Sequence, residues 1–593
     1  MLGRKEIVSD LCVVGGGMAG ICAAIAAARA GISVVLMHER SVLGGNASSE
    51  IRMWICGASG RDNRETGIIE EIALENYFRN PTKNYYIWDT ILYDFVKREK
   101  NLTLLLNCTC MDAKTETGDF GDGRTKNIVS VTGYQMTTQT FFDVKSKYYA
   151  DCSGDSILAP LTGAEYRIGR ESADEFGENT SIKEKDNLTM GMSCLLQGRE
   201  TNEPIKYTAP NFSMKLSDKD FKYRNPDLYN NYENFWYLEL GGNKDTIHDT
   251  EEITEELISL ATGTWDYIKN SGKYPSKNWD LEFIGFLPGK RESRRMIGEY
   301  TITEKDISKN KIFDDTVAYG GWPLDDHPPV GFHYNGEPNV SIETPSPYCI
   351  PYRAMYAKEV SNLFFAGRNI SMTHMALSST RVMATCAVIG QAVGTAAAIA
   401  AKNNMTPHEV YKNKLGELQE LLLENDCFLP NIKRGISELC RSTPIANGND
   451  TLKDGEDRPN TIYGSTECGI DVANGTSLTY SFDKPEYIRT LHLTFDSDLN
   501  RDTLPGDLPE RSHSMRCNVK LDSPQCYVPK TLCRKFKVSL DTPSGTKTIM
   551  DTDCNLRRAY NLDINEPVRS ITVVPLSNWG GTDRTRIFSY DFK

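Results

Sequence analysis

The stretch that decides the fold is EIVSDLCVVGGGMAGICAAIAAARAGISVVLM, residues 6–37. It opens with an apolar run (6–14), passes through a cluster of glycines and an alanine-rich segment (21–30), and closes with a second apolar run (33–37). This order predicts a strand, a tight turn, a helix and a second strand within about 30 residues. That is the layout of one crossover unit, in which the two strands lie parallel in the same sheet.

The glycine cluster, Gly15-Gly16-Gly17-Met18-Ala19-Gly20, matches the spacing G-x-G-x-x-G. Gly15 allows the turn out of the strand, Gly17 lets the backbone approach a pyrophosphate, and Gly20 lets the helix pack close to the sheet. The N-terminus of the helix offers unpaired N–H groups to a phosphate. Glu39, 24 residues after Gly15, is placed to accept hydrogen bonds from a ribose. The setting predicts dinucleotide binding.

A second glycine pair follows soon after the acidic residue. Arg40 is followed by Leu43-Gly44-Gly45-Asn46. A longer cofactor than NAD must run past more backbone, so this pair favours FAD, with a solvent-exposed Gly-Gly turn as the alternative interpretation.

A distant segment, residues 361–400, is expected to complete the same site. Residues 362–369 (NLFFAGRN) predict a buried strand that ends at Gly367, and residues 381–402 predict a long helix with Gly390 and Gly394 among alanines. The N-terminus of such a helix, aimed at a flavin, would stabilise negative charge on the reduced ring by about 0.3–2 kcal/mol.

Seven stretches between residues 10 and 402 carry a resemblance to a known family. They are VVGGGMAG, HERSVLGGNAS, YADCSGDS, GTWDYIKNSG, GKRESRRMIGEYTIT, IPYRAMY and NLFFAGRNISMTHMALSSTRVMATCAVIGQAVGTAAA. The chain resembles the FAD-dependent oxidoreductases of the glutathione-reductase-like, two-dinucleotide-fold superfamily. The resemblance covers about two-thirds of the chain.

This resemblance implies a set of cofactor-binding residues. For the ADP half and the pyrophosphate they are Gly15, Gly17, Gly20, Glu39, Arg40, Gly44, Gly45 and Asn46; for the adenine, the backbone of Cys110; and beside the rest of the cofactor, Gly154, Asp155, Gly367 and Arg368. One residue departs from the pattern. Many members have Asp after the glycine at 367, so the role of that Asp is either vacant here or taken by Asp155, whereas Arg368 is suited to phosphate oxygens.

The candidate catalytic residues lie between the strand at Gly367 and the helix at 381–402. His374 suits a general base, because the pKa of imidazole is near neutrality; a structural histidine is an equal alternative. Ser378 and Ser379 lie beside it. Arg381 is a candidate for stabilising the reduced flavin or a substrate carboxylate, and a surface ion pair is the other interpretation.

A cluster of arginines in GKRESRRMIGEY (289–300) gives a further candidate. In helical register Arg291 and Arg295 share one face. Arg295 is therefore taken as a candidate for anchoring a substrate, against the alternative of salt bridges to Glu292 or Glu299. Cys56 lacks a second cysteine at disulfide-reductase spacing, which argues against dithiol chemistry.

The fold class expected is an α/β, Rossmann-like FAD-binding core that is discontinuous in sequence, with an inserted α+β cap and a C-terminal all-β sandwich of jelly-roll type. The predicted divisions are 1–164 and 346–404 for the core, 165–345 for the cap, 405–440 for a helical connector and 441–593 for the sandwich. The last part resembles galactose-binding-like modules, in which Trp579 would either stack on a sugar or serve in packing.

Composition limits the partners and the compartment. The net charge of −13 argues against a general nucleic-acid binder. The apolar stretch 11–28 contains four glycines and fits strand–turn–helix better than a membrane span. No metal site is expected, and a disulfide among the five cysteines of the last quarter is conceivable if the protein is exported. A soluble protein is expected, cytoplasmic or exported, and its oligomeric state is left open.

Taken together, the sequence predicts an FAD-dependent oxidoreductase that transfers a hydride between the flavin and a small organic substrate. A sugar or glycoside is the hypothesis for that substrate. Three alternatives remain: a non-catalytic carbohydrate-binding protein with a structural flavin, a scaffold with an empty nucleotide fold, and a reductase that uses an external electron carrier.

Overall fold

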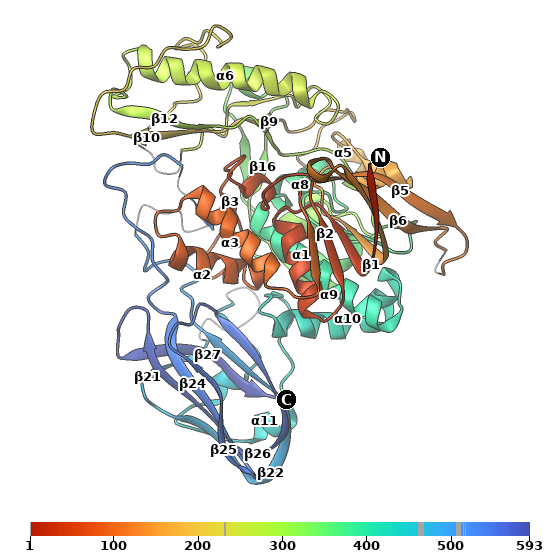
Figure 1. Cartoon of the computed structure of the whole chain (residues 1–593), viewed down its shortest axis with the longest axis vertical. Helices are drawn as coiled ribbons and strands as arrows, with labels where there is room; N and C mark the ends of the chain where they lie inside the picture. The colour runs from red at the N-terminus through yellow and green to blue at the C-terminus, as the bar shows by residue number, and fades with distance from the viewer. Residues whose placement is uncertain are drawn as a thin grey trace.

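The computed structural model describes residues 2–121, 123–229, 233–460, 468–505, 512–513, 515 and 517–593. Three bodies follow one another along its longest axis (Figure 1). A cap lies at one end, an α/β domain in the middle and an antiparallel β module at the other end.

The central domain is built on one seven-stranded sheet, in the order β4-β2-β1-β7-β6-β5 with β19 also paired to β7. The strands are β1 (Gly3–Val14), β2 (Val34–Met37), β4 (Leu102–Leu105), β5 (Cys108–Thr117), β6 (Lys126–Gln135), β7 (Thr140–Asp151) and β19 (Leu363–Phe365). β4, β2, β1, β7 and β19 run parallel, whereas β5 and β6 add antiparallel strands at one edge. The predicted discontinuous core is confirmed, because a strand from residue 363 onward joins a sheet built by the first 151 residues.

Two small-residue helices, α1 (Met18–Arg29) and α9 (Met383–Asn403), pack directly against each other. A Cβ at Gly390 would lie 2.1 Å from the backbone oxygen of Ala19, and one at Gly394 would lie 2.1 Å from that of Ala23. Glycine is therefore required at both positions for this backbone contact. Among the described helices, α9 alone is long and apolar enough to cross a membrane, but 94% of its apolar window is buried inside the protein.

The remaining helices of the central domain and the connector are α2 (Ile68–Arg79), α3 (Tyr85–Lys97), α4 (Leu158–Thr162), α8 (His374–Thr380) and α10 (Pro407–Glu424). The short helix α11 (Glu438–Ser442) lies in the β module (Figure 1), where Cys440 belongs to the core. α10 begins with Pro407 at its first position and a capping box between Thr406 and Glu409, which satisfies the free N–H groups of its first turn.

The cap combines short strands with one long helix, α6 (Thr250–Asn270), which lies over β10 and β12 (Figure 1). The apolar face of α6 includes Leu257, Ala261 and Trp265, which pack in one core with Trp279. The other elements are α5 (Ala173–Phe176), α7 (Glu304–Ser308), β8 (Tyr166–Arg167), β9 (Met192–Ser193), β10 (Leu196–Glu200), β11 (Glu239–Leu240), β12 (Trp279–Ile284), β13 (Gly289–Lys290), β14 (Arg295–Met296), β16 (Leu324–Asp326) and β17 (Val340–Ile342). The paired strands β15 (Thr316–Gly320) and β18 (Tyr348–Pro351) belong instead to the core around α1 and α9.

The β module is antiparallel throughout, in the order β21-β27-β22-β26-β24-β25 with β20 paired to β22. Its strands are β20 (Ile445–Ala446), β21 (Ile470–Ala473), β22 (Leu478–Phe495), β24 (Cys533–Thr542), β25 (Gly545–Thr552), β26 (Ala559–Asn578) and β27 (Arg584–Phe592). Two short apolar runs, LTYSF (478–482) and RTLHLTF (489–495), both lie in β22. Register shifts after Ser481 and Ile488 let this long strand keep pairing with β26.

Trp579, at the end of β26, is used for packing. Its indole N–H donates to the backbone oxygen of Asn555 at 2.8 Å, and its ring lies 5.6 Å, centroid to centroid, from that of Phe78 in α2. Both the polar and the apolar part of this side chain are thus engaged, which is the packing alternative of the two that the sequence left open.

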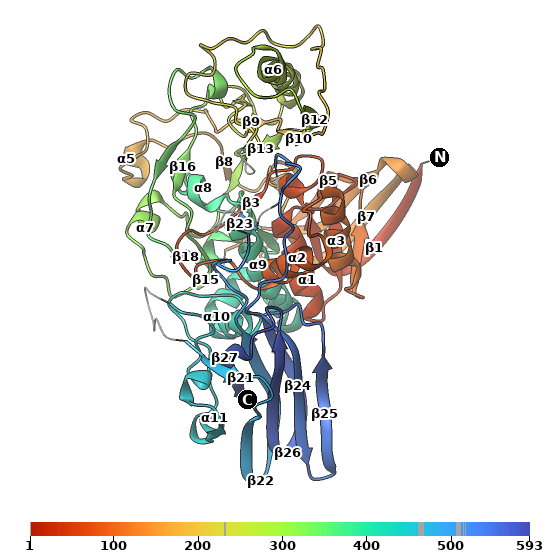
Figure 2. The same cartoon turned by 90° about the vertical axis from the view of Figure 1, so that its left-hand side faces the viewer.

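A return segment, residues 496–505 and 517–532, leaves the β module and runs back past α2 and α3 to the cap (Figures 1 and 2). Arg501 forms a buried ion pair with Glu70 of α2 at 2.6 Å, and Val519 forms a bridge with Arg199 of β10. Between these contacts, β23 (Ser512–His513) pairs with β3 (Ile55–Cys56) of the central domain. The cysteines of the described residues form no disulfide in this structure, including those of the last quarter.

Candidate functional site

A cavity of about 410 Å³ runs from the glycine cluster after β1 to the cap. Eleven of the residues predicted from the sequence line it: Gly15, Gly17, Glu39, Arg40, Gly44, Gly45, Asn46, Gly154, Gly367, Arg368 and Arg381. The first residues of α9, Val382 and Met383, also belong to its wall, so the N-terminus of that helix reaches the cavity. Segments more than 300 residues apart in the sequence therefore form one site.

The turn after β1 has room only for glycine at two positions. Gly15 has a φ of +108°, and a Cβ there would lie 2.3 Å from the backbone oxygen of Cys152. A Cβ at Gly20 would lie 1.8 Å from the oxygen of Gly15. Both contacts are far closer than real Cβ contacts, so the strand–helix turn and the close packing of α1 depend on these two glycines.

The second glycine pair faces the first across the cavity. The N–H of Gly44 donates to the oxygen of Gly16 at 2.8 Å, and a Cβ on Gly45 would lie 3.0 Å from the Cα of Gly17. Gly45 has a φ of +60° and Gly44 one of +108°. Two bare backbone turns thus lie side by side at the start of α1, which leaves N–H groups accessible to a phosphate.

Beside the two glycine turns, the Glu39 carboxylate is a hydrogen-bond acceptor and the Arg40 guanidinium supplies hydrogen-bond donors. Burial raises the pKa of Glu39, but contacts with His38 and Arg40 outweigh burial and hold that pKa at about 2. Glu39 is therefore ionised at neutral pH. The Nε and Nη1 atoms of Arg40 are buried and have no hydrogen-bond partner among the described residues. These donors and the Glu39 carboxylate fit the hydroxyl and phosphate oxygens of a dinucleotide.

The cap contributes an acid–base cluster that the sequence interpretation missed, around Asp325 and His327. Nδ1 of His327 lies 2.6 Å from Oε2 of Glu239, and its Nε2 lies 3.3 Å from Oδ2 of Asp325. Nη2 of Arg381 lies 3.0 Å from the same Asp325 oxygen and 3.1 Å from Nε2 of His327. Asp325, His327 and Arg381 line the cavity. The sequence feature that could have revealed this cluster is the acidic pair followed by histidine at residues 325–327.

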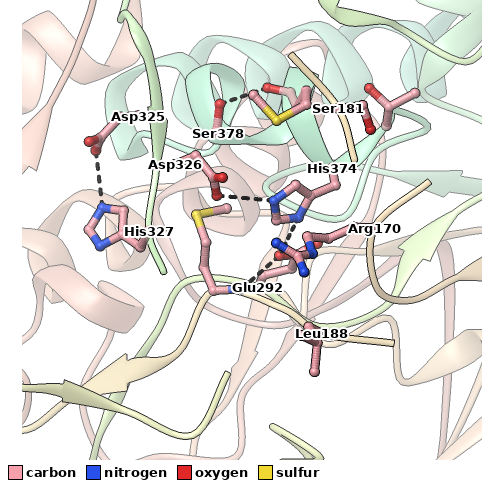
Figure 3. Close-up of polar contacts among 12 residues, drawn as sticks. Arg170, Ser181, Leu188, Glu292, Asp325, Asp326, His327, His374 and Ser378 are labelled. Atoms are coloured by element: carbon pink, nitrogen blue, oxygen red, sulfur yellow. Dashed lines mark hydrogen bonds and ion pairs between the residues drawn. The ribbon is translucent and has the colours of Figure 1, made fainter. Parts of the chain in front are cut away.

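The side chains of Asp325 and Asp326 point in opposite directions because β16 alternates its faces. Figure 3 shows Asp325 beside His327 and Asp326 beside His374. His374 Nδ1 lies 2.9 Å from Oε2 of Glu292, and its Nε2 lies 3.0 Å from Oδ1 of Asp326. Burial lowers the pKa of His374, but these two carboxylates raise it to about 10. The imidazole is a buried cation at neutral pH and does not line the cavity.

Comparison with known proteins identifies the family. Residues 10–422 match the family model described as FAD dependent oxidoreductase. The chain belongs to the FAD-dependent oxidoreductase family. No curated protein matches the chain.

Similar solved structures share little sequence with this oxidoreductase. The E. coli quinol fumarate reductase FrdA is 11% identical, with a TM-score of 0.27, and the match covers 71% of this chain and 75% of that one. A geranylgeranyl bacteriochlorophyll reductase-like protein from Thermoplasma acidophilum is 11% identical, with a TM-score of 0.30, covering 71% and 85%. The family 32 carbohydrate-binding module of Streptococcus pneumoniae EndoD is 10% identical, with a TM-score of 0.17, covering 26% and 99%.

FAD is the cofactor of this oxidoreductase, and the residues of the cavity fit it. The departure at Arg368 has a structural counterpart. Nη2 of Arg368 lies 2.6 Å from Oδ1 of Asp155, whose other oxygen lies 2.9 Å from Nζ of Lys290. Burial raises the pKa of Asp155, but these two cations bring it well below its ordinary range. Arg368 and Lys290 line the cavity while Asp155 stands behind them, so two cationic side chains face the cavity at this position.

Four other predicted residues also lie outside the cavity lining. Gly20 packs α1 on its turn, Cys110 is buried in β5 opposite Gly133 of β6, and His374 lies behind β16. Arg295 is fully buried in the cap, where it bonds to Glu171 at 3.1 Å and to the oxygen of Gly169. These side chains support the walls of the site in this structure and do not form its surface.

The helical register expected for Arg291 and Arg295 is wrong. Residues 289–290 and 295–296 are short strands, paired with β9 and β8, and the residues between them are not helical. Arg291 lines the cavity, and its guanidinium donates to Ser193 Oγ at 2.9 Å and to the oxygen of Trp236 at 2.8 Å. Among the described residues, no group of three or more His, Cys, Asp or Glu could hold a metal ion.

Proposed function

We propose that the enzyme transfers a hydride between FAD and a neutral, hydroxyl-bearing small molecule, with a sugar or glycoside as the substrate class. The observation that carries this proposal is the composition of the cap end of the cavity, where the charges are paired and tryptophan rings form part of the wall. FAD, when bound, supplies the two-electron chemistry by accepting or donating a hydride. The chain supplies the binding surface, the orientation of the substrate and the exclusion of water.

Each arginine at the cap end already has a carboxylate partner. Arg381 pairs with Asp325 at 3.0 Å, and Arg291 pairs with Glu239 at 3.4 Å. Anionic substrates are ordinarily held by charge-assisted bonds from an arginine or lysine. Because neither guanidinium carries surplus charge, a carboxylate or phosphate substrate would have to displace an existing partner. A neutral substrate requires no such exchange.

Aromatic and polar side chains alternate on the wall of the same cavity. The rings of Trp54, Trp236 and Trp322 line it, together with Asn339 and Ser341. Nε1 of Trp322 has no hydrogen-bond partner among the described residues. Aromatic faces suit the C–H faces of a sugar ring, while nearby polar groups suit its hydroxyls. This combination supports a polyhydroxylated substrate.

The test is anaerobic bleaching of the flavin absorbance against a matched panel of neutral sugars, glycosides, 2-hydroxy acids and amines. We expect the neutral sugars or glycosides to reduce the flavin, and the hydroxy acids of similar size to leave it oxidised. Faster bleaching by hydroxy acids would refute the assignment of a neutral substrate. If dithionite reduces the flavin but no organic donor does, the alternative of a structural flavin gains support.

The terminal electron acceptor is tested separately, by turnover in the presence of oxygen. Release of peroxide during aerobic turnover would identify an oxidase. Turnover that requires an artificial dye would favour a dehydrogenase or a reductase coupled to an external carrier.

A further inference from the structure

We infer that His327 is the acid–base residue of the cavity, the group that takes the hydroxyl proton when an alcohol substrate is oxidised and returns it in the reverse direction. The identity of the substrate in this inference rests on the proposed function. The position of the proton on the imidazole ring follows from the geometry of the cap alone.

Glu239 fixes which nitrogen of His327 carries the permanent proton. The distance from Nδ1 to Oε2 of Glu239 is 2.6 Å, and both side chains are 2% exposed. Burial raises the pKa of Glu239, but Arg291 and His327 outweigh burial and hold it below its ordinary value. Because an ionised carboxylate only accepts, Nδ1 must be the donor in this pair. Nε2 is thereby left as the nitrogen that gains or loses a proton.

Nε2 has one donor and one acceptor within reach. Arg381 Nη2, at 3.1 Å, can only donate, and Asp325 Oδ2, at 3.3 Å, can only accept when ionised. The two hydrogens of Arg381 Nη2 are also within reach of two Asp325 oxygens, the backbone O at 3.1 Å and Oδ2 at 3.0 Å. With Arg381 held by Asp325, neutral His327 presents the lone pair of Nε2 to the substrate hydroxyl, and protonated His327 donates to Asp325 Oδ2. A histidine built this way suits repeated proton transfer, because either state meets a prepared partner.

Three other titratable groups at the cap end of the cavity do not meet this requirement. Burial raises the pKa of Asp325, but His327 and Arg381 bring it well below its ordinary range, so its carboxylate is a weak base. Burial raises the pKa of the Cys56 thiol to about 12. Glu239 is covered by its partners Arg291 and His327. His327 is thus the wall group whose ring has a fixed proton on one nitrogen and both a donor and an acceptor beside the other.

The transfer balances as follows. The substrate carbon loses a hydride to FAD and is oxidised from alcohol to carbonyl, while the proton of its O–H group passes to Nε2 of His327. The groups that face the imidazole during this step are Glu239, Asp325, Arg381 and the Trp236 ring, with Arg291 behind Glu239 and Asp326 behind Asp325.

The kinetic test compares His327→Gln with His248→Gln, a matched change at an exposed histidine of the cap. We expect kcat/KM of His327→Gln to fall by about 10²–10⁴-fold, the ordinary contribution of a positioned base. The limb of the pH–rate profile that reports the base should disappear, and FAD content should stay at the wild-type level. A His327→Gln enzyme within threefold of wild type, with an unchanged pH profile, would overturn the inference.

The second test does not need a substrate. In ¹⁵N-histidine-labelled holoenzyme, the His327 signals, assigned by their loss in His327→Gln, should report a proton on Nδ1 and a titrating Nε2. Glu239→Gln should shift this tautomer balance. A signal with the fixed proton on Nε2 would overturn the inference even if the flavin is bleached by sugars. Conversely, if no sugar bleaches the flavin, the proposed function fails while the tautomer measurement still decides the role of the imidazole.

Discussion

Two histidines stand on opposite sides of the same short strand, and they differ in what faces their nitrogens. His374 lies between two carboxylates, Asp326 and Glu292, and is enclosed by protein. His327 has a carboxylate on one nitrogen and, on the other, an arginine and a carboxylate at the cavity wall. The same residue type is therefore a fixed cation in one place and a switchable group in the other.

The difference follows from alternation along the chain. Asp325 and Asp326 point to opposite faces of β16, Asp325 toward His327 and Asp326 toward His374. Their counterparts at 291–292 divide likewise: Arg291 contacts Glu239, the partner of His327, and Glu292 contacts His374. Because His374 meets a carboxylate at each ring nitrogen, loss of its proton would remove a donor from one of them. His327 has both a donor and an acceptor within reach of Nε2, so this nitrogen has a partner in either protonation state.

The largest expected effect of breaking the inner cluster is on stability. His374→Gln removes a buried cation between two carboxylates, and breaking such a pair costs about 3–5 kcal/mol. We expect the free energy of unfolding to fall by that amount, measured by urea denaturation of the holoenzyme. The folded fraction should keep kcat/KM within a few-fold of wild type, in contrast to His327→Gln. A large loss of kcat with unchanged stability would reverse the roles assigned to the two histidines.

The pH dependence of the free energy of unfolding should also reveal that His374 is a buried cation. The pKa of His374 is raised from 6.5 to about 10, so its contribution is fully present below pH 6.5 and is lost as pH rises toward 10. Subtracting the stability profile of His374→Gln from that of wild type isolates this contribution. The difference should be constant in mild acid and shrink through the alkaline range. A difference that instead grows with pH would contradict the raised pKa.

A smaller change comes from neutralising one of the two carboxylates. Glu292→Gln keeps a hydrogen-bonding group next to His374 but removes one charge. The pKa of His374 should then move down from about 10, because the nearby negative charge that raised it is gone. We expect a loss of about 1–3 kcal/mol of stability. Histidine NMR titration measures the pKa shift directly, and an unmoved titration would show that Asp326 alone sets it.

The smallest effect is expected at Asp325. Asp325→Asn leaves the shape of the wall but removes the acceptor for protonated His327 and the counter-charge of Arg381. We expect kcat/KM to fall by about tenfold, less than in His327→Gln, because the protonated ring loses one acceptor. The measurement is kcat/KM under substrate-limiting conditions, with His248→Gln as the exposed control. An unchanged kcat/KM would show that Asp325 does not accept from the protonated imidazole.

The parts that could be predicted from the sequence are those fixed by local pattern. The spacing of Gly15, Gly17 and Glu39 within one crossover unit predicts the dinucleotide site, and the alternation of apolar runs predicts the central strands. The long alanine-rich helix was predictable for the same reason. These features need only a few dozen neighbouring residues to be recognised.

The structure of the cap could not be predicted from local pattern, because its strands are two to six residues long and pair across large separations in the sequence. Arg291 lies between two such strands, and the helical register predicted for it is wrong. The position of His374 in the chain predicts a catalytic role, whereas the carboxylates that surround it come from residues 292 and 326. The sequence left two roles open for Trp579, and its contact with Phe78 of a distant helix depends on residues about 500 positions apart.

The return segment has a consequence for the making of the protein. Cys56 belongs to the wall of the cavity, and its strand is completed by residues 512–513, more than 450 positions later. At roughly 5–20 residues per second of synthesis, β3 waits between about twenty seconds and a minute and a half for its partner strand. A chain interrupted before residue 512 therefore lacks the strand that pairs with β3 at the cavity wall.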